Sequence, residues 1–183
     1  MAKPANPLSI DELIEQLRSR DEAELEKAHE AIMSLGEDVT EPLCTALKDG
    51  SFQVRMGAAR ALGELGSERA LGPLVETLAD PSVNVQRKGV EALAAMGVKA
   101  VPTLVEKLGD KDAKMRRRAA ETLGLIADLS ALTALVGALG DDDAEVRKQA
   151  ARALGKIKAS GATARLIDML DDDNVELCRY AAE

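Results

Sequence analysis

Aromatic residues are almost absent from this chain of 183 residues, which has no tryptophan, one tyrosine (Tyr180) and one phenylalanine (Phe52). Strands favour aromatic and β-branched residues, so a core built mainly from alanine, leucine, valine and isoleucine favours thin, closely spaced helices instead. Proteins that bind single-stranded nucleic acid commonly stack bases on aromatic rings, and this chain has almost no aromatic side chains for that purpose. The composition therefore predicts an all-α protein and disfavours nucleic acid as a partner.

Long apolar runs and clustered cysteines are also missing. No apolar stretch approaches the roughly 20 residues that span a bilayer, and the start of the chain has no apolar signal segment. Cys44 and Cys178 are far apart in sequence, and we expect them at opposite ends of the molecule, unpaired, as in a reducing compartment. With 46% hydrophobic and 31% charged residues, the sequence predicts a folded cytoplasmic protein without membrane contact.

The residue sets that carry catalysis are scarce as well. His29 is the single histidine, and the chain has no phosphate-binding glycine loop and no cysteine cluster with zinc spacing. The acidic strings DDDAEV and DDDNVE lack the spacing of a calcium-binding EF-hand loop. The sequence therefore predicts a protein that is not an enzyme and that holds no metal or other cofactor.

What the chain does contain is a repeat. The aspartates that open successive units, spaced by 31, 30, 31 and 31 residues, are Asp49, Asp80, Asp110, Asp141 and Asp172. Each of the first four is followed by a long helical stripe of apolar residues, as in VRMGAARALGELG and MRRRAAETLGLIA, and then by a shorter one, as in PLVETLAD and TLVEKLGD. Two helices cannot bury their stripes alone, so the units must stack on one another.

The repeat sets the predicted boundaries within a single domain, 1–183. They are a loose tail over 1–8, an N-terminal half repeat over 9–19, five repeats over 21–48, 49–79, 80–109, 110–140 and 141–171, and the first helix of a further repeat over 172–183. We expect Ser9 and Glu12 to form a capping box and each repeat aspartate to cap the helix that follows it. The open C-terminal end is a surface where a partner, or a second copy in a dimer, could pair.

These strings resemble the HEAT-like repeat family, in the short form known from bilin lyases. The resemblance implies a right-handed α-α superhelix, an α-solenoid of five helix pairs with half repeats at both ends. It also implies a polar ladder between repeats, formed by each turn aspartate and the arginine six residues later. The ladder pairs would be Asp49 with Arg55, Asp110 with Arg116, and Asp141 with Arg147, with breaks at Gln86 and Cys178.

In this family the second helices line the concave face, which is the usual binding surface. The exposed position after each apolar pair is acidic in four copies, which we call the acidic stripe: Glu15, Glu76, Glu106 and Asp168. Such a stripe would attract a basic protein or peptide. The main prediction is therefore a non-catalytic protein–protein interaction scaffold, and the alternative is a bilin lyase-like subunit acting on phycobiliprotein chromophores.

Two further hypotheses come from single segments. The basic run DAKMRRRAAE offers phosphate contacts at Lys114, Arg116, Arg117 and Arg118, although the net charge of −8 disfavours a nucleic-acid-binding module. His29 precedes Glu30, and the HEAT-like enzyme deoxyhypusine hydroxylase binds two irons through repeated His-Glu pairs. A single histidine in a different register predicts a partly buried packing residue instead.

Overall fold

The computed structural model describes residues 8–157, without the side chains of Glu37 and Asp38, and its regular structure in this range is entirely helical. The chain forms two compact units, one up to Ala92 and one from Leu93 on, with the boundary inside a helix. The predicted second helix of the fifth repeat, the helix from residue 172 and nearly all of the predicted tail lie outside the described residues.

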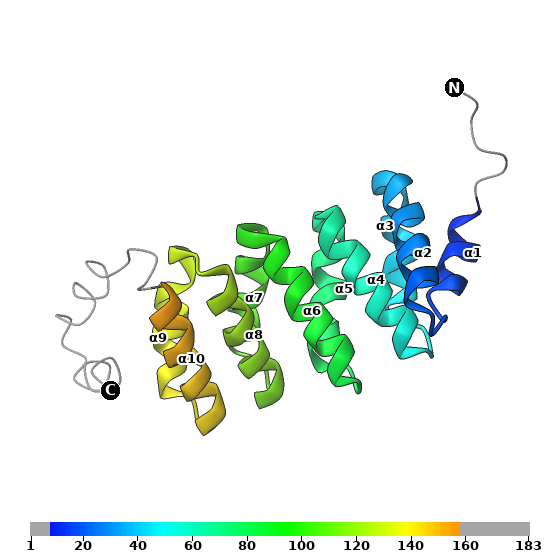
Figure 1. Ribbon diagram of the computed structural model, residues 1–183. Helices are drawn as coiled ribbons and strands as arrows, with labels where there is room; N and C mark the ends of the chain where they lie inside the picture. Colours follow the sequence, from blue (N-terminus) through cyan, green and yellow to red (C-terminus); the bar gives the residue numbers. More distant parts are fainter. Residues whose placement is uncertain (1–7, 158–183) are drawn as a thin grey trace. The chain divides into compact units, whose positions relative to one another are not determined.

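Long and short α-helices alternate along the chain (Figure 1). The long ones are α2 (Glu22–Ser34), α4 (Phe52–Leu65), α6 (Val83–Ala95), α8 (Ala113–Ile126) and α10 (Ala144–Ile157). The short ones are α1 (Ile10–Gln16), α3 (Thr40–Ala46), α5 (Leu71–Glu76), α7 (Val101–Lys107) and α9 (Leu132–Gly137). Turns of 3-10 helix precede or extend the short helices, at Gly36–Val39, Glu68–Ala70, Thr77–Ala79, Gly97–Ala100, Leu129–Ala131 and Ala138–Gly140. The alternation confirms the predicted all-α repeat fold.

The ends of the helices follow local sequence signals. Ser9 and Glu12 form the capping box predicted for the start of α1. Gly36, Gly66 and Gly97 have positive φ angles of 73°, 64° and 61° where the first helix of a repeat ends, a conformation that glycine adopts without a steric penalty. Ala127 takes the equivalent place after α8 with a φ of 54°, so this repeat makes the same turn without glycine.

The repeat aspartates accept hydrogen bonds from the residue just before each helix, and not from the first turn of the helix as the sequence predicted. The carboxylate of Asp49 accepts the backbone N–H of Ser51, and Asp80 accepts that of Ser82, each at 2.7 Å. Asp110 and Asp141 likewise accept the N–H of the residue two positions on. These bonds fix the turn that enters the helix and not its first turn, because the helix begins after the residue that is bonded.

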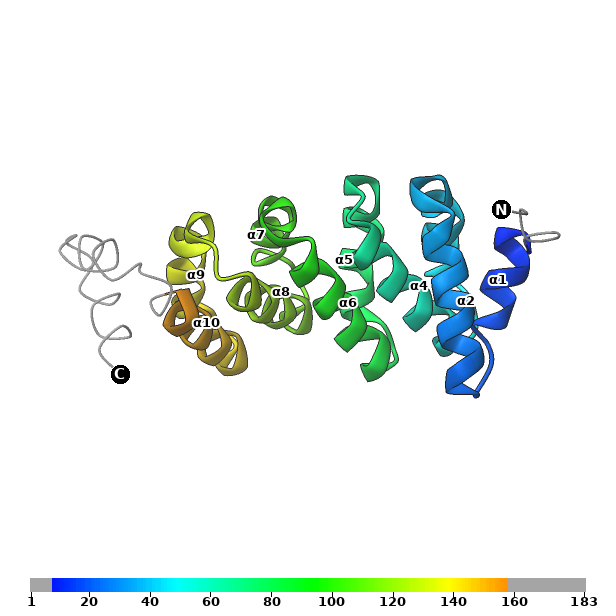
Figure 2. The same ribbon diagram turned by 45° about the horizontal axis from the view of Figure 1, so that its top comes forward.

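Close approach of first helices depends on small residues. A Cβ atom added at Gly63 would lie 2.5 Å from the Cα of Ala92, and one added at Gly124 would lie 2.8 Å from the Cα of Ala153. The second contact joins α8 to α10, which lie side by side in both views (Figure 1 and Figure 2). The Leu-Gly step in the repeat motif therefore leaves room for the backbone of the next first helix.

Arginine bridges join consecutive repeats, in a pairing that differs from the one the resemblance implied. Arg55 donates from Nε and Nη2 to the carboxylate of Asp80, at 2.7 and 2.9 Å, and from Nη1 to the backbone carbonyl of Asp49 at 2.8 Å. The arginine thus binds the backbone of its own repeat aspartate and the side chain of the next one. Both side chains of this ion pair are largely buried, with 14% and 8% exposed.

The same arrangement recurs in the second unit. Arg116 binds the carboxylate of Asp141 with two hydrogen bonds of 2.7 Å and the carbonyl of Asp110 at 2.9 Å. Arg147 donates to the carbonyl of Asp141. At the first unit's start, Arg18 pairs with Asp49 at 2.8 Å, and at Gln86 the amide donates to the carbonyl of Asp80. The bridges of Arg18, Arg55 and Arg116 therefore each use the carboxylate of the aspartate that opens the following repeat.

Replacing Gly63 with valine should destabilise the protein by about 2–3 kcal/mol, because the added side chain would collide with the backbone of α6 at Ala92. Chemical denaturation followed by circular dichroism measures the change. The matched control is Gly72→Ala in α5, where an added Cβ meets nothing within 4 Å and should stabilise by up to about 1 kcal/mol. Equal stability of the valine variant and the wild type would contradict the close approach.

The ladder also predicts how stability depends on pH. Hydrogen bonds from Arg116 hold the pKa of Asp141 below its ordinary value, so this carboxylate stabilises the fold above the unfolded pKa of about 3.9 and loses that effect as the pH falls further. Asp141→Asn should cost about 2 kcal/mol at pH 7 and flatten the decline in stability below pH 4. Urea titrations from pH 2 to 7 measure both effects, and the exposed neighbour Asp142→Asn, which should change little, is the control.

Candidate functional site

The acidic stripe is exposed wherever the structure describes it. Glu15 lies on α1 and pairs with Arg18 at 2.8 Å, while Glu76 lies at the end of α5. Both belong to the first unit, and Glu106 is exposed on α7 in the second unit. Asp168 lies outside the described residues. The role of these carboxylates in binding stays a prediction.

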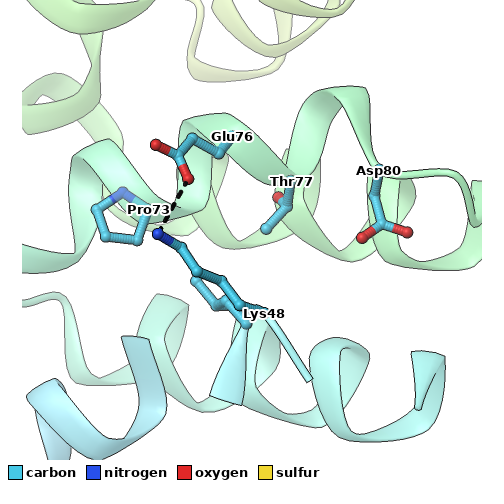
Figure 3. A pocket seen from close by; sticks show the side chains of 6 residues that line it. Lys48, Pro73, Glu76, Thr77 and Asp80 are labelled. Carbon is cyan, nitrogen blue, oxygen red and sulfur yellow. Dashed lines mark ion pairs between the residues drawn. The ribbon is translucent and has the colours of Figure 1, made fainter. Parts of the chain in front are cut away.

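A groove opens beside Glu76, within the first unit. Its lining comes from the end of α3 and from α5 with its 3-10 extension: Leu47, Lys48, Pro73, Glu76, Thr77 and Asp80. Figure 3 shows Lys48 reaching across from one side toward the carboxylate of Glu76 on the other. The groove has a volume of about 60 Å³, which admits the end of one side chain. Pockets that enclose drug-sized ligands measure about 300–1,000 Å³, so this groove cannot enclose a tetrapyrrole.

The charges around the groove are unequally paired. Asp80 is bound by Arg55 and by the N–H of Ser82. Burial alone would raise the pKa of the Asp80 carboxyl, but these hydrogen bonds outweigh it and leave the pKa below its ordinary value. The Lys48 ammonium and the Glu76 carboxylate are 3.9 Å apart, with 74% and 71% of their side chains exposed. An exposed pair at this distance is weak, which leaves Glu76 available to another cation.

The sequence indicated Glu76 but not the groove. Its walls come from two consecutive repeats, and Lys48 occupies a position that other copies fill with different residues, whereas Pro73 matches Pro42 of the preceding repeat. A signal was nevertheless present, because the lysine just after α3 stands where other copies have Ala79, Gly109, Gly140 and Asp171. Departures from a repeat pattern on an exposed face therefore deserve the same attention as the pattern itself.

The basic run on α8 is partly neutralised. Arg116 is bound by Asp141, and Arg118 donates to Glu121 at 2.7 Å. Lys114 is exposed and Arg117 is half-buried. Two of the four proposed phosphate contacts are thus already engaged with carboxylates of the protein, which weakens the case for nucleic-acid binding.

His29 belongs to a cluster that joins α2 to α4. Its Nε2 lies 2.8 Å from Glu64 Oε2 and carries the proton, because a carboxylate only accepts. Arg60 donates to Glu64 at 3.1 Å and to both carboxylate oxygens of Glu26, at 2.7 and 2.9 Å. His29 is buried, with 4% of its surface exposed, which is more complete than the partial burial that the sequence predicted.

The two residues of the His29–Glu64 pair in this cluster are not repeated at the equivalent positions of later copies. Burial would raise the pKa of the Glu64 carboxyl, but hydrogen bonds from His29 and Arg60 leave the pKa below its ordinary value. The positions that match Glu64 in later copies are Ala95, Leu125 and Lys156. The histidine and its carboxylate partner are therefore a linked departure from the repeat, and their separation of 35 residues could have indicated the contact.

Neither a metal cluster nor a membrane-spanning helix occurs in the described part of the chain. Among residues 8–157 no three histidine, cysteine, aspartate or glutamate side chains converge as metal ligands. Over the same residues, no helix is long and apolar enough to cross a membrane.

A curated relative shares sequence with part of this chain. It is the phycocyanobilin lyase subunit alpha of Picosynechococcus, which is 34% identical over 80 residues, 43% of this chain and 28% of the relative. The matched segment thus spans less than a third of the relative's length. Because that relative is named as a lyase subunit, the expectation that this protein is not an enzyme, and with it the non-catalytic part of the scaffold prediction, is wrong.

Solved structures share the architecture. The crescerin TOG domain aligns with a TM-score of 0.66 at 19% identity, covering 96% of this chain and 88% of its own, which shows a common fold and no more. The CpcE–CpcF complex of phycocyanin lyase from Nostoc aligns over 99% of this chain and 77% of its own, with a TM-score of 0.47 and 24% identity.

Sequence models of the HEAT repeat match almost the whole chain, over residues 10–94, 73–139 and 101–183. They cover the stacked helix pairs, the bridging arginines and the repeat aspartates described above. The chain belongs to the HEAT-repeat family.

Proposed function

We propose that this protein is a repeat subunit of a bilin-lyase-type assembly, which binds a protein partner and takes part in handling the chromophore of a phycobiliprotein. The observation that carries the proposal is the 34% identity over 80 residues to a phycocyanobilin lyase subunit. The HEAT-repeat architecture supports the protein-binding part, because stacked helix pairs present extended surfaces to other chains.

The size of the groove bears on which tasks this subunit would perform and which another chain of the assembly would perform. The groove beside Glu76 is too small for a tetrapyrrole but large enough for a side chain of a protein. In this proposal the subunit contributes binding and positioning of the protein substrate, and the bilin is enclosed together with another chain of the assembly. Holding reactants in register is a large part of catalysis in its own right.

A chromophore assay tests the proposal. The purified chain is incubated with phycocyanobilin and apo-phycocyanin, alone and together with a second lyase subunit from the same organism. Covalent attachment or transfer changes the visible absorbance of the bilin, and the change should persist after denaturation of the phycocyanin. We expect the rate to rise at least tenfold over the same mixture without the chain.

The control for indirect effects is the Gly72→Ala variant, which keeps the fold and should keep the rate. A mixture in which the chain neither changes the spectrum nor forms a complex with apo-phycocyanin or holo-phycocyanin in size-exclusion chromatography would contradict the proposal. A complex without a spectral change would support the protein-binding part of the proposal and contradict the part that concerns the chromophore.

A further inference from the structure

We propose that the groove beside Glu76 receives a lysine side chain of the protein partner, whose ammonium group takes the place of Lys48 in the ion pair with Glu76. This inference rests on the proposed function, since it names the chemistry by which the partner would be recognised. It goes beyond the acidic stripe because it assigns one cavity and one kind of side chain.

The shape of the groove suits an unbranched side chain with a charged end. Leu47 and Pro73 supply apolar walls along which a chain of methylene groups can pack, as lysine stems do on apolar surface. Glu76 lies at the mouth, opposite Lys48 (Figure 3). A volume of about 60 Å³ accepts the end of one such side chain.

The polar atoms of the groove favour a cation. The Thr77 hydroxyl is not open to a ligand, because it is buried, donates to the carbonyl of Leu74 at 2.6 Å and lies against Gly89 of α6. Helices α3 and α5 both end here, at Ala46 and Glu76, and helix C-termini carry partial negative charge. Lys48 is the one positive group in the lining, so its displacement leaves a site made of acceptors.

Lys48 can be displaced at little cost. Its ion pair with Glu76 is long, at 3.9 Å, and both side chains are more than two-thirds exposed, so the pair contributes little to stability. The Asp80 carboxylate is different, since Arg55 holds it with two short bonds and would not release it. Glu76 is therefore the exchangeable carboxylate and Asp80 a fixed one.

Lysine suits this groove better than arginine. The groove is small, at about 60 Å³, and a compact ammonium group needs less room than a planar guanidinium group. The carboxylate of Asp80 already receives the fork of Arg55, so Glu76 is the carboxylate left for the ammonium group.

A titration followed by two-dimensional NMR tests the inference on the full chain. The probe is a capped pentapeptide of glycine and serine with a central lysine. We expect saturable shifts of the backbone amides of Lys48, Glu76 and Thr77. Glu76→Gln should weaken binding about fivefold, whereas Lys48→Met should strengthen it about twofold by removing the competing cation.

Controls of equal charge come from α2. Glu30→Gln and Lys27→Met make the same changes in net charge at exposed positions on a first helix, and both should leave the affinity within about twofold. A peptide with norleucine in place of lysine should produce no saturable shifts, because it lacks the charge. A peptide with the shorter diaminopropionate should bind at least threefold more weakly, because its single methylene group cannot cover the apolar walls at Leu47 and Pro73.

Several results would overturn the inference. They are equal binding of the norleucine or diaminopropionate peptide, tighter binding of an arginine peptide, equal weakening by Glu30→Gln and Glu76→Gln, or shifts confined to other residues. The chromophore assay, run with wild type and Glu76→Gln, separates this failure from that of the proposed function. If Glu76→Gln keeps the wild-type chromophore activity, the inference about the groove is contradicted and the proposed function stands. If the chain binds the lysine peptide saturably but shows no chromophore activity, the proposed function is contradicted and the inference about the groove stands.

Discussion

No helix pair of this chain can bury its apolar stripes by itself, and every other feature of the structure depends on that constraint. Stacking supplies the missing core, and it works only if first helices approach closely. Gly63 against Ala92 and Gly124 against Ala153 provide this approach within the two units. The core can then be built from alanine, leucine and valine, because thin helices at short separation leave no space for aromatic rings.

Once the helices stack, the bridging arginines fix the register between repeats. Arg55 and Arg116 each bond to the backbone of one turn and to the carboxylate of the next, so a single side chain contacts two consecutive repeats. Desolvation of such a charge is costly unless all its partners are present. The bridges therefore favour one spacing of the units over others. Exposed surfaces such as the groove beside Glu76 inherit their shape from that spacing.

The sequence predicted what depends on local pattern. The period of the aspartates and the capping box at Ser9 each follow from a few neighbouring residues, and the structure confirms them. It did not predict which carboxylate each arginine binds, because that depends on the offset between repeats. Nor did it predict that each aspartate carboxylate accepts the backbone N–H of the residue just before the helix. The groove was missed for the same reason, since Lys48 and Pro73 meet only after two repeats have stacked.

The prediction that this protein is not an enzyme failed for a more general reason. A search for nucleophiles, bases and metal ligands assumes that one chain contains the whole reaction site. A repeat protein distributes its binding energy over a surface, and that energy can position a reactant whose chemistry occurs at the edge of another subunit. The absence of catalytic sets from one sequence therefore excludes a self-contained active site, but it does not exclude a role in catalysis. For a chain similar to a lyase subunit, the informative residues are those that select the partner, and Glu76 with its groove is the site that we propose for this selection.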